Sequence, residues 1–171
     1  MQIKAKKSLG QNFLIDKNII NKIVAVANIQ PNDNILEIGP GTGNLTESIL
    51  NKKPKKIFVI EKDERLVNLL SERFKNQITI INEDILKISE HSISNDELIV
   101  FGNLPYNIST QILAKWIISA YNKKWYKSLI LMFQKEVANR ILAKTNSKNY
   151  GRLTILSNWK LDVKKIVDIS A

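Results

Sequence analysis

The sequence of 171 residues contains no cysteine and a single histidine. The lack of cysteine excludes a disulfide framework and thiolate metal ligands. One histidine alone leaves too few ligands for a catalytic zinc ion, so we expect no metal site. Long apolar runs are also missing: no stretch is long enough to cross a bilayer, and the basic start of the chain leads into a polar segment. These absences predict a cytoplasmic protein without a membrane anchor.

Acidic residues are also scarce. Asp and Glu together number 16 against 26 Lys and Arg, which gives a net charge of +10. This excess favours a polyanionic partner, and a generally lysine-rich composition accounts for part of it. The cluster of Lys4, Lys6 and Lys7 is the stronger candidate for contact with such a partner. A second cluster at 52–56 is expected at the end of the sheet opposite the site, so we do not assign it to the substrate.

Hydrophobic residues make up 44% of the chain, which is enough for the core of one domain. Short apolar runs alternate with segments of helical periodicity. This alternation is typical of an α/β fold with a doubly wound, mostly parallel sheet. The expected strands are 35–38, 57–60, 78–81, 98–101, 129–133 and 165–168, and the expected helices are 16–28, 44–51, 63–74, 109–120, 135–143 and 150–159.

A glycine-rich turn follows the first expected strand, where residues 35–46 read ILEIGPGTGNLT. Glycines at such a turn let the backbone approach a ligand closely. The spacing is G-x-G-x-G, so it does not match the G-x-G-x-x-G pattern of dinucleotide sites, and no Walker A lysine follows. Glu37 at the strand end has two readings: it organises the turn by accepting backbone N–H bonds, or it contacts a ligand directly.

Acidic residues close the next two expected strands. Glu61 follows the strand at 57–60, and Asp84 follows the strand at 78–81. Because the carboxyl ends of parallel strands meet at one edge of the sheet, both carboxylates are expected beside the glycine turn. Glu61 is placed to bind the two hydroxyls of a ribose. Asp84 is placed to accept from an adenine amino group, with Ile85 against the ring or, alternatively, packed only in the core.

The most informative motif is Asn103-Leu104-Pro105-Tyr106, which follows the apolar run at 98–101. The amide oxygen of Asn103 and a nearby backbone carbonyl can accept hydrogen bonds from an exocyclic amine. Pro105 fixes the turn, and Tyr106 offers a stacking face for a base. Two acceptors on the hydrogens of adenine N6 favour a pyramidal nitrogen, so they stabilise the transition state of a methyl transfer more than the ground state.

Five segments together resemble the ribosomal RNA adenine N6-dimethyltransferase family, in its bacterial small-subunit (16S) branch. They read KKSLGQNFL at 6–14, EIGPGTG at 37–43, NLPYNIS at 103–109, QKEVA at 134–138 and YGRL at 150–153. The resemblance covers the whole chain. It implies the Rossmann-like fold of class I methyltransferases, with S-adenosylmethionine as the methyl donor. It also implies an enzyme that dimethylates N6 of two adjacent adenosines near the 3′ end of 16S RNA, with the small ribosomal subunit as partner.

The resemblance also implies a role for individual residues. The catalytic set is Asn103, Leu104 through its backbone carbonyl, Pro105 and Tyr106. The cofactor-binding set is Gln11, Asn12, Leu14, Gly39, Gly41, Glu61, Asp84, Ile85 and Asn103. Leu14, like Ile85, has ordinary core packing as its alternative.

The family continues beyond the position of Ala171 with a Phe- and Pro-rich loop, a seventh strand and a helical domain. The resemblance therefore implies a catalytic domain over 1–171 without the C-terminal helical domain, and we expect a monomer. Two alternatives share these motifs. One is the related 23S adenine methyltransferase of the macrolide-resistance type, and the other is a ribosome-assembly factor whose binding matters more than its catalysis. A DNA amino-methyltransferase fits less well, since those enzymes carry a second Pro at the position of Leu104.

Overall fold

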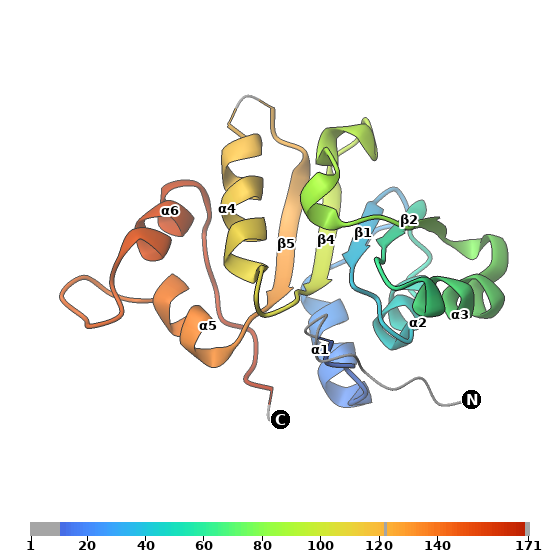
Figure 1. Ribbon diagram of the computed structural model, residues 1–171, viewed down its shortest axis with the longest axis horizontal. Coiled ribbons are helices and arrows are strands. Elements are labelled where there is room, and N and C mark those ends of the chain that lie inside the picture. The colour runs from blue at the N-terminus through green and yellow to red at the C-terminus, as the bar shows by residue number, and fades with distance from the viewer. Residues whose placement is uncertain (1–10, 122, 170–171) are drawn as a thin grey trace.

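A computed structural model describes residues 11–121 and 123–169 as an α/β fold built on one parallel sheet (Figure 1). The sheet has five strands in the order β3-β2-β1-β4-β5, and every neighbouring pair is parallel. The doubly wound parallel sheet predicted from the sequence is therefore confirmed. The strands are β1 Asn34–Ile38, β2 Lys56–Ile60, β3 Thr79–Ile81, β4 Leu98–Asn103 and β5 Tyr126–Met132.

Helices connect these strands. Asp16 caps the first helix, because its carboxylate accepts from the backbone N–H groups of Asn18 and Ile19. The helices are α1 Lys17–Val26, α2 Asn44–Leu50, α3 Glu64–Phe74, α4 Ser109–Ser119, α5 Lys135–Ile141 and α6 Arg152–Lys160. Three short 3-10 turns lie at Lys75–Gln77, Ile85–Lys87 and Glu90–Ser92. No helix within the described ranges has the length and apolar character needed to cross a bilayer.

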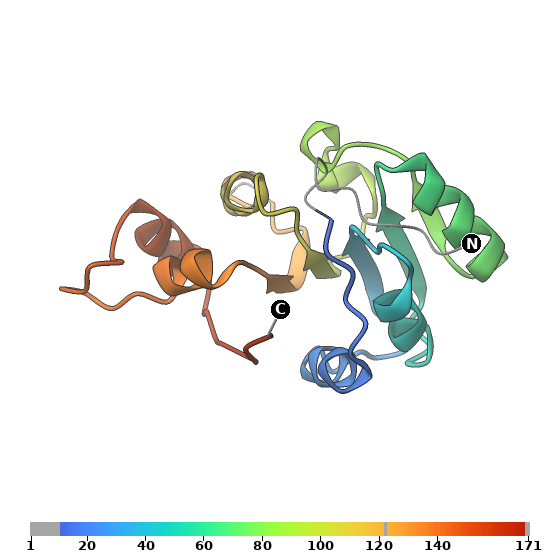
Figure 2. The same cartoon turned by 60° about the horizontal axis from the view of Figure 1, so that its bottom comes forward.

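Each central strand sends side chains to both faces of the sheet, so two cores form. On β1, Ile35 belongs to the core that buries α1, α2 and the end of α3, while Leu36 belongs to the core under α4. Figure 2 shows α1, in blue, and α4, in yellow, on opposite sides of the sheet. A third, smaller cluster joins α4 to α5 and α6 through Ile117, Val137 and Leu153.

The sixth strand expected at 165–168 is wrong, because the structure is irregular from 161 to 169. Ile166 of this segment is partly buried without a strand and packs on the core under α1, and Val163, which precedes the expected strand, packs on the cluster of α4, α5 and α6. Trp159 near the end of α6 is 55% exposed and stacks on Tyr121, with the ring centroids 6.0 Å apart.

Of the two lysine clusters in the sequence, only the one at 52–56 belongs to the residues that the structure describes. The cluster of Lys4, Lys6 and Lys7 lies outside them, as does the start of the segment 6–14. The second lysine cluster lies between α2 and the start of β2. Because all strands are parallel, the start of β2 is at the amino edge of the sheet, opposite the carboxyl ends that carry the predicted site. This placement agrees with the prediction.

Candidate active site

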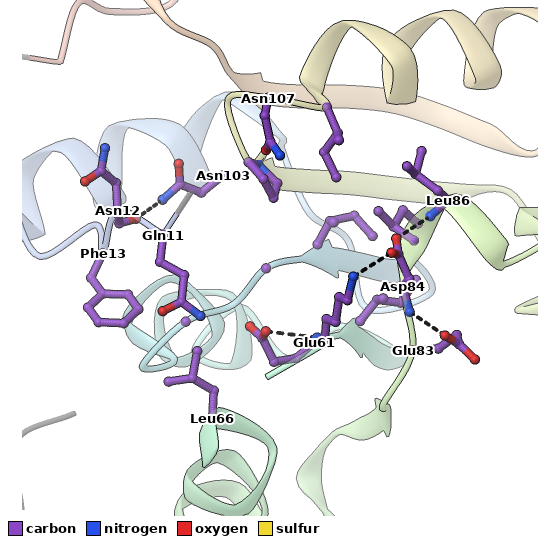
Figure 3. Close-up of a pocket in the computed structure, with 18 residues that line it drawn as sticks. Gln11, Asn12, Phe13, Glu61, Leu66, Glu83, Asp84, Leu86, Asn103 and Asn107 are labelled. Atoms are coloured by element: carbon purple, nitrogen blue, oxygen red, sulfur yellow. Dashed lines mark hydrogen bonds and ion pairs between the residues drawn. The ribbon is translucent and has the colours of Figure 1, made fainter. Parts of the chain in front are cut away.

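A cavity of about 190 Å³ lies at the carboxyl edge of the sheet, where β1, β2, β3 and β4 end (Figure 3). Residues from all four strand ends and from the start of the chain line it together. The predicted residues on its wall are Gln11, Asn12, Gly39, Gly41, Glu61, Asp84, Ile85, Asn103 and Pro105. Leu14 lies in a small adjoining hollow, which also touches Gly39 and Asn103. Segments far apart in sequence thus converge on one site.

The glycine turn brings the end of β1 close to the end of β4. Gly39 has a positive φ of 63°, and a side chain at this position would meet the backbone oxygen of Asn103 at 3.4 Å. Gly41, with φ of 59°, has no room for a Cβ atom because the Phe13 ring would lie 2.9 Å from it. The positive φ favours glycine at both positions, and at Gly41 the Phe13 ring adds a packing reason.

Residues 11–14 cross the site and are fixed by hydrogen bonds to four other parts of the fold. The Gln11 side chain donates to Asp63 at 3.1 Å, and Asn44 donates to the carbonyl of Leu14 at 3.1 Å. The Asn12 backbone carbonyl accepts from the amide nitrogen of Asn103, and the Asn12 side chain donates to the Tyr106 hydroxyl at 2.7 Å. This segment therefore links the side of the cavity near Asp63 to the turn at 103–106.

Glu61 is the buried acid of the site and is 7% exposed. Its Oε1 accepts from the backbone N–H groups of Lys62 and Asp63, both at 2.9 Å. Burial raises the pKa of the Glu61 carboxyl, and these backbone hydrogen bonds oppose the rise. The backbone thus fixes the carboxylate at the cavity wall, where it is suited to accept from hydroxyl groups.

Asp84 stands at the other end of the cavity and begins the 3-10 turn Ile85–Lys87. Its Oδ1 accepts from the Leu86 N–H at 3.0 Å, and its Oδ2 pairs with the Lys62 ammonium at 2.9 Å (Figure 3). The hydrogen bond from Lys62 holds the pKa of the Asp84 carboxyl below its ordinary value. Each carboxylate oxygen has two acceptor positions, so Asp84 keeps capacity for a ligand amino group.

Residues 103–106 form the turn at the end of β4, and two of them are hydrogen-bonded to Asn12. Because the Asn103 amide nitrogen donates to Asn12, its amide oxygen is oriented away from that bond (Figure 3). Leu104 is 1% exposed as a whole residue and packs near Gly102, and unlike Asn103 and Pro105 it is not among the residues on the cavity wall. Tyr106 does not line the cavity: its ring is 37% exposed beside it, with its hydroxyl bound to Asn12.

The cavity wall includes residues that sequence reasoning did not assign. They are Phe13, Ile38, Ile60, Lys62, Leu66, Glu83, Leu86, Asn107 and Ile108. Asn107 follows the catalytic motif directly, and Lys62 follows the acid of β2, so their positions beside assigned residues were the available signal. Leu66 on α3 carried no such signal, because its apolar character marks it only as a core residue.

Glu37 is fully enclosed at the end of β1, with 2% exposure. Its Oε2 accepts from the Thr46 hydroxyl of α2 at 2.7 Å. Burial raises the pKa of the Glu37 carboxyl to about 7; the Thr46 hydrogen bond opposes that rise, and the nearby Glu61 adds to it. The contact anchors this acid to the helix that follows the glycine turn; among the described residues its hydrogen-bond donor is this hydroxyl and not a backbone N–H of the turn, so neither reading is confirmed.

The raised pKa makes stability depend on pH. The folded chain keeps the Glu37 proton to a higher pH than the unfolded chain, so this contribution is complete below pH 4.5 and is lost as the pH rises through about 7. Between pH 5 and 8, wild type is expected to lose between about 2 and 3 kcal/mol more unfolding free energy than Glu37→Gln. Urea unfolding at both values measures this. An equal loss of unfolding free energy in wild type and Glu37→Gln would contradict this prediction. So would a reduced loss in Glu72→Gln, the control at an exposed position.

Comparison with known families and proteins shows which family has these motifs. The chain matches the family model described as ribosomal RNA adenine dimethylase over residues 2–171. It is 62% identical over 169 residues to the ribosomal RNA small subunit methyltransferase A of Pelagibacter ubique, covering 99% of this chain and 64% of that protein. The protein of the same name from Wolbachia pipientis wMel is 48% identical over 98% of this chain and 58% of the relative. The chain thus spans less than two thirds of these relatives.

Solved structures give the same picture of the fold. A dimethyladenosine transferase from Plasmodium falciparum aligns with a TM-score of 0.76 and 34% identity, over 86% of this chain and 52% of that one. The 23S rRNA methyltransferase ErmE aligns with a TM-score of 0.68 and 27% identity, over 85% of this chain and 57% of that one. Both alignments extend over most of this chain, so the arrangement of strands and helices is shared.

Proposed function

The chain belongs to the ribosomal RNA adenine dimethylase family, and from this premise we propose that it transfers methyl groups from S-adenosylmethionine to N6 of two adjacent adenosines near the 3′ end of 16S rRNA. The observation that carries the proposal is the meeting of Asn103 with Glu61 and Asp84 on the wall of one cavity. In this proposal Asn103 binds the target amine, and the two acids bind the nucleoside part of the methyl donor. We also propose that it acts as a monomer in the cytoplasm.

The donor set fits the cofactor. S-adenosylmethionine carries a ribose with two hydroxyls, a flat adenine and a charged amino-acid end, and when bound it supplies a methyl group on a positive sulfur. Glu61 would hold the ribose hydroxyls, and Asp84 would accept from the adenine amino group. Ile38, Ile60 and Ile85 give the cavity apolar surface suited to the ring. Gly39 would let the amino-acid end approach the backbone, since no Cβ occupies that space.

Asn103 and Leu104 would act on the target amine. The Asn103 amide nitrogen is engaged by Asn12, which leaves the amide oxygen to accept a hydrogen bond. The Leu104 carbonyl would accept the second one. These acceptors hold N6 in line with the methyl group and stabilise the charge that develops on it. No dedicated base is required, because the methylated amine is acidic enough to release its proton to water or to the same acceptors.

Tyr106 would support the target base. Its ring is partly exposed beside the cavity, and the hydrogen bond from Asn12 to its hydroxyl limits its orientations. A flipped base can stack on such a ring. The net charge of +10 supports an RNA substrate through phosphate contacts, which depend steeply on salt.

The test offers tritiated S-adenosylmethionine and two substrates in parallel, unmethylated small ribosomal subunits and free 23S RNA. Mass spectrometry of the nucleosides then identifies the product. We expect dimethyladenosine in the small subunit alone. Product on 23S RNA alone would overturn the choice of substrate in favour of the macrolide-resistance type. Binding of the small subunit with no product on either RNA would favour the assembly-factor alternative.

A further inference from the structure

Lys115 of α4 binds three oxygen atoms that lie outside its own helix. Its ammonium donates to the carbonyl of Ile85 at 3.1 Å and to the carbonyl of Ile88, and it pairs with the Glu90 carboxylate at 2.7 Å. An ammonium group has three N–H donors, so these partners use all of them. The side chain is 30% exposed. In the other lysine ion pairs of the described residues, the lysine side chains are 51–79% exposed.

Glu90 is the buried member of this cluster. It is 2% exposed, and its Oε1 also accepts from the indole nitrogen of Trp116 at 2.8 Å. A buried carboxylate is stable only when a cation and hydrogen-bond donors compensate for the lost water. Lys115 and Trp116 supply these, and both project from α4. This ion pair is a finding of the structure.

The two carbonyls that Lys115 holds belong to the segment that forms one end of the cofactor cavity. Asp84 begins this segment, and Ile85 lines the cavity while being 5% exposed. Lys115 thus fixes the backbone at Ile85 from behind the cavity wall. No other side-chain hydrogen bond to the carbonyls of Ile85 or Ile88 is present in the described parts of the chain. These two carbonyls therefore receive their side-chain hydrogen bonds from one ammonium group, whereas Asp84 is held separately by Leu86 and Lys62.

The turn at 103–106, which we propose to act on the target amine, lies just before the start of helix α4. The Ser109 hydroxyl donates to the carbonyl of Tyr106 at 3.3 Å. One helix therefore contacts both the target-base side and the adenine side of the site. A displacement of either contact would change the distance between the two halves of the site.

We propose that Lys115 is a positioning residue for the adenine ring of the cofactor, with Glu90 as its buried counterion. The inference rests on the proposed function, because it assumes an adenosine-containing ligand in the cavity. Without the ammonium, the carbonyls of Ile85 and Ile88 lose their donor, and Asp84 and Ile85 no longer hold the geometry that the adenine needs. The ligand then binds less tightly and with less preference for the adenine amino group.

The test separates this role from simple destabilisation. Lys115→Met alone leaves an unpaired buried carboxylate, so it also lowers the melting temperature. The double variant Lys115→Met/Glu90→Gln removes that charge, and the glutamine oxygen still accepts from Trp116. Calorimetric titration measures binding of S-adenosylhomocysteine and of S-inosylhomocysteine, which has an oxygen in place of the adenine amino group. Lys127→Met is the matched control, because Lys127 pairs with Asp33 at 2.9 Å at the amino edge of the sheet.

The double variant is expected to recover most of the melting temperature but to bind S-adenosylhomocysteine about tenfold more weakly than wild type. Its preference for the adenine ligand over the inosine ligand should fall, whereas Lys127→Met should match wild type in both. If the double variant binds both ligands as wild type does, the role of Lys115 is refuted and the proposed function stands. If wild type itself binds no S-adenosylhomocysteine, both proposals are overturned.

Discussion

Asn103→Ala is expected to reduce methyl transfer by about a hundredfold, because the target amine loses an acceptor that acts most strongly in the transition state. The fold should persist. The lost hydrogen bond to the Asn12 carbonyl costs about 1 kcal/mol of stability, and β4 keeps its pairing on both sides. The measurement is single-turnover transfer to unmethylated small subunits with saturating S-adenosylmethionine, together with thermal unfolding.

Asn158→Ala is the matched control for this experiment. Its side chain also donates to a backbone carbonyl, that of Thr154 at 2.9 Å, but on α6. It should leave the transfer rate unchanged. A rate within threefold of wild type for Asn103→Ala would remove Asn103 from the proposed mechanism. An equal loss in Asn158→Ala would show that the effect comes from a general loss of structure.

Glu61→Gln is expected to raise the dissociation constant of S-adenosylhomocysteine by between about tenfold and a hundredfold. Hydrogen bonds from ribose hydroxyls to a carboxylate are charge-assisted, and each contributes roughly 1.5–3 kcal/mol. Stability should not fall with it, because burial already raises the pKa of this carboxyl and an uncharged amide loses less on burial. Calorimetric titration at neutral pH measures the binding, and thermal unfolding measures the stability.

Glu64→Gln tests whether the effect belongs to this position. Glu64 is exposed at the start of α3, three residues from Glu61, and carries the same charge. Its replacement should leave the dissociation constant unchanged. An unchanged constant in Glu61→Gln would show that the ribose is not held by this carboxylate. Equal weakening in both variants would indicate a long-range effect of net charge instead.

The order of strands and helices was predictable, because in this chain a buried parallel strand is a short apolar run and helices such as α1 and α3 have an amphipathic face. The strand expected at 165–168 shows the limit of that reasoning. The adjacent apolar residues Ile166 and Val167 indicate burial, and both are partly buried. They do not report whether a neighbouring strand is available to complete the backbone hydrogen bonds, and that depends on tertiary structure.

In the candidate site, too, some residues were predictable from the sequence and others depend on tertiary packing. Glu61, Asp84 and Asn103 were predicted because each ends a strand, and the ends of parallel strands meet. Their roles as ligand contacts remain predictions. The ion pair of Lys115 and Glu90 could not be foreseen, since its members are 25 residues apart, one within a helix and one in a short 3-10 turn. Only the packing of that turn against α4 brings them together.

The hydrogen bonds of residues 11–14 also set an order of events during folding. Asn12 binds Asn103 and Tyr106, which are 91 and 94 residues away in sequence. Closing such long loops is entropically costly, so these bonds are expected to form only after β1, β2 and β4 have paired. The ribosome makes this segment before those strands, yet it should become ordered after them. Until it docks, the carboxyl edge of the nascent sheet stays open to water and to chaperones.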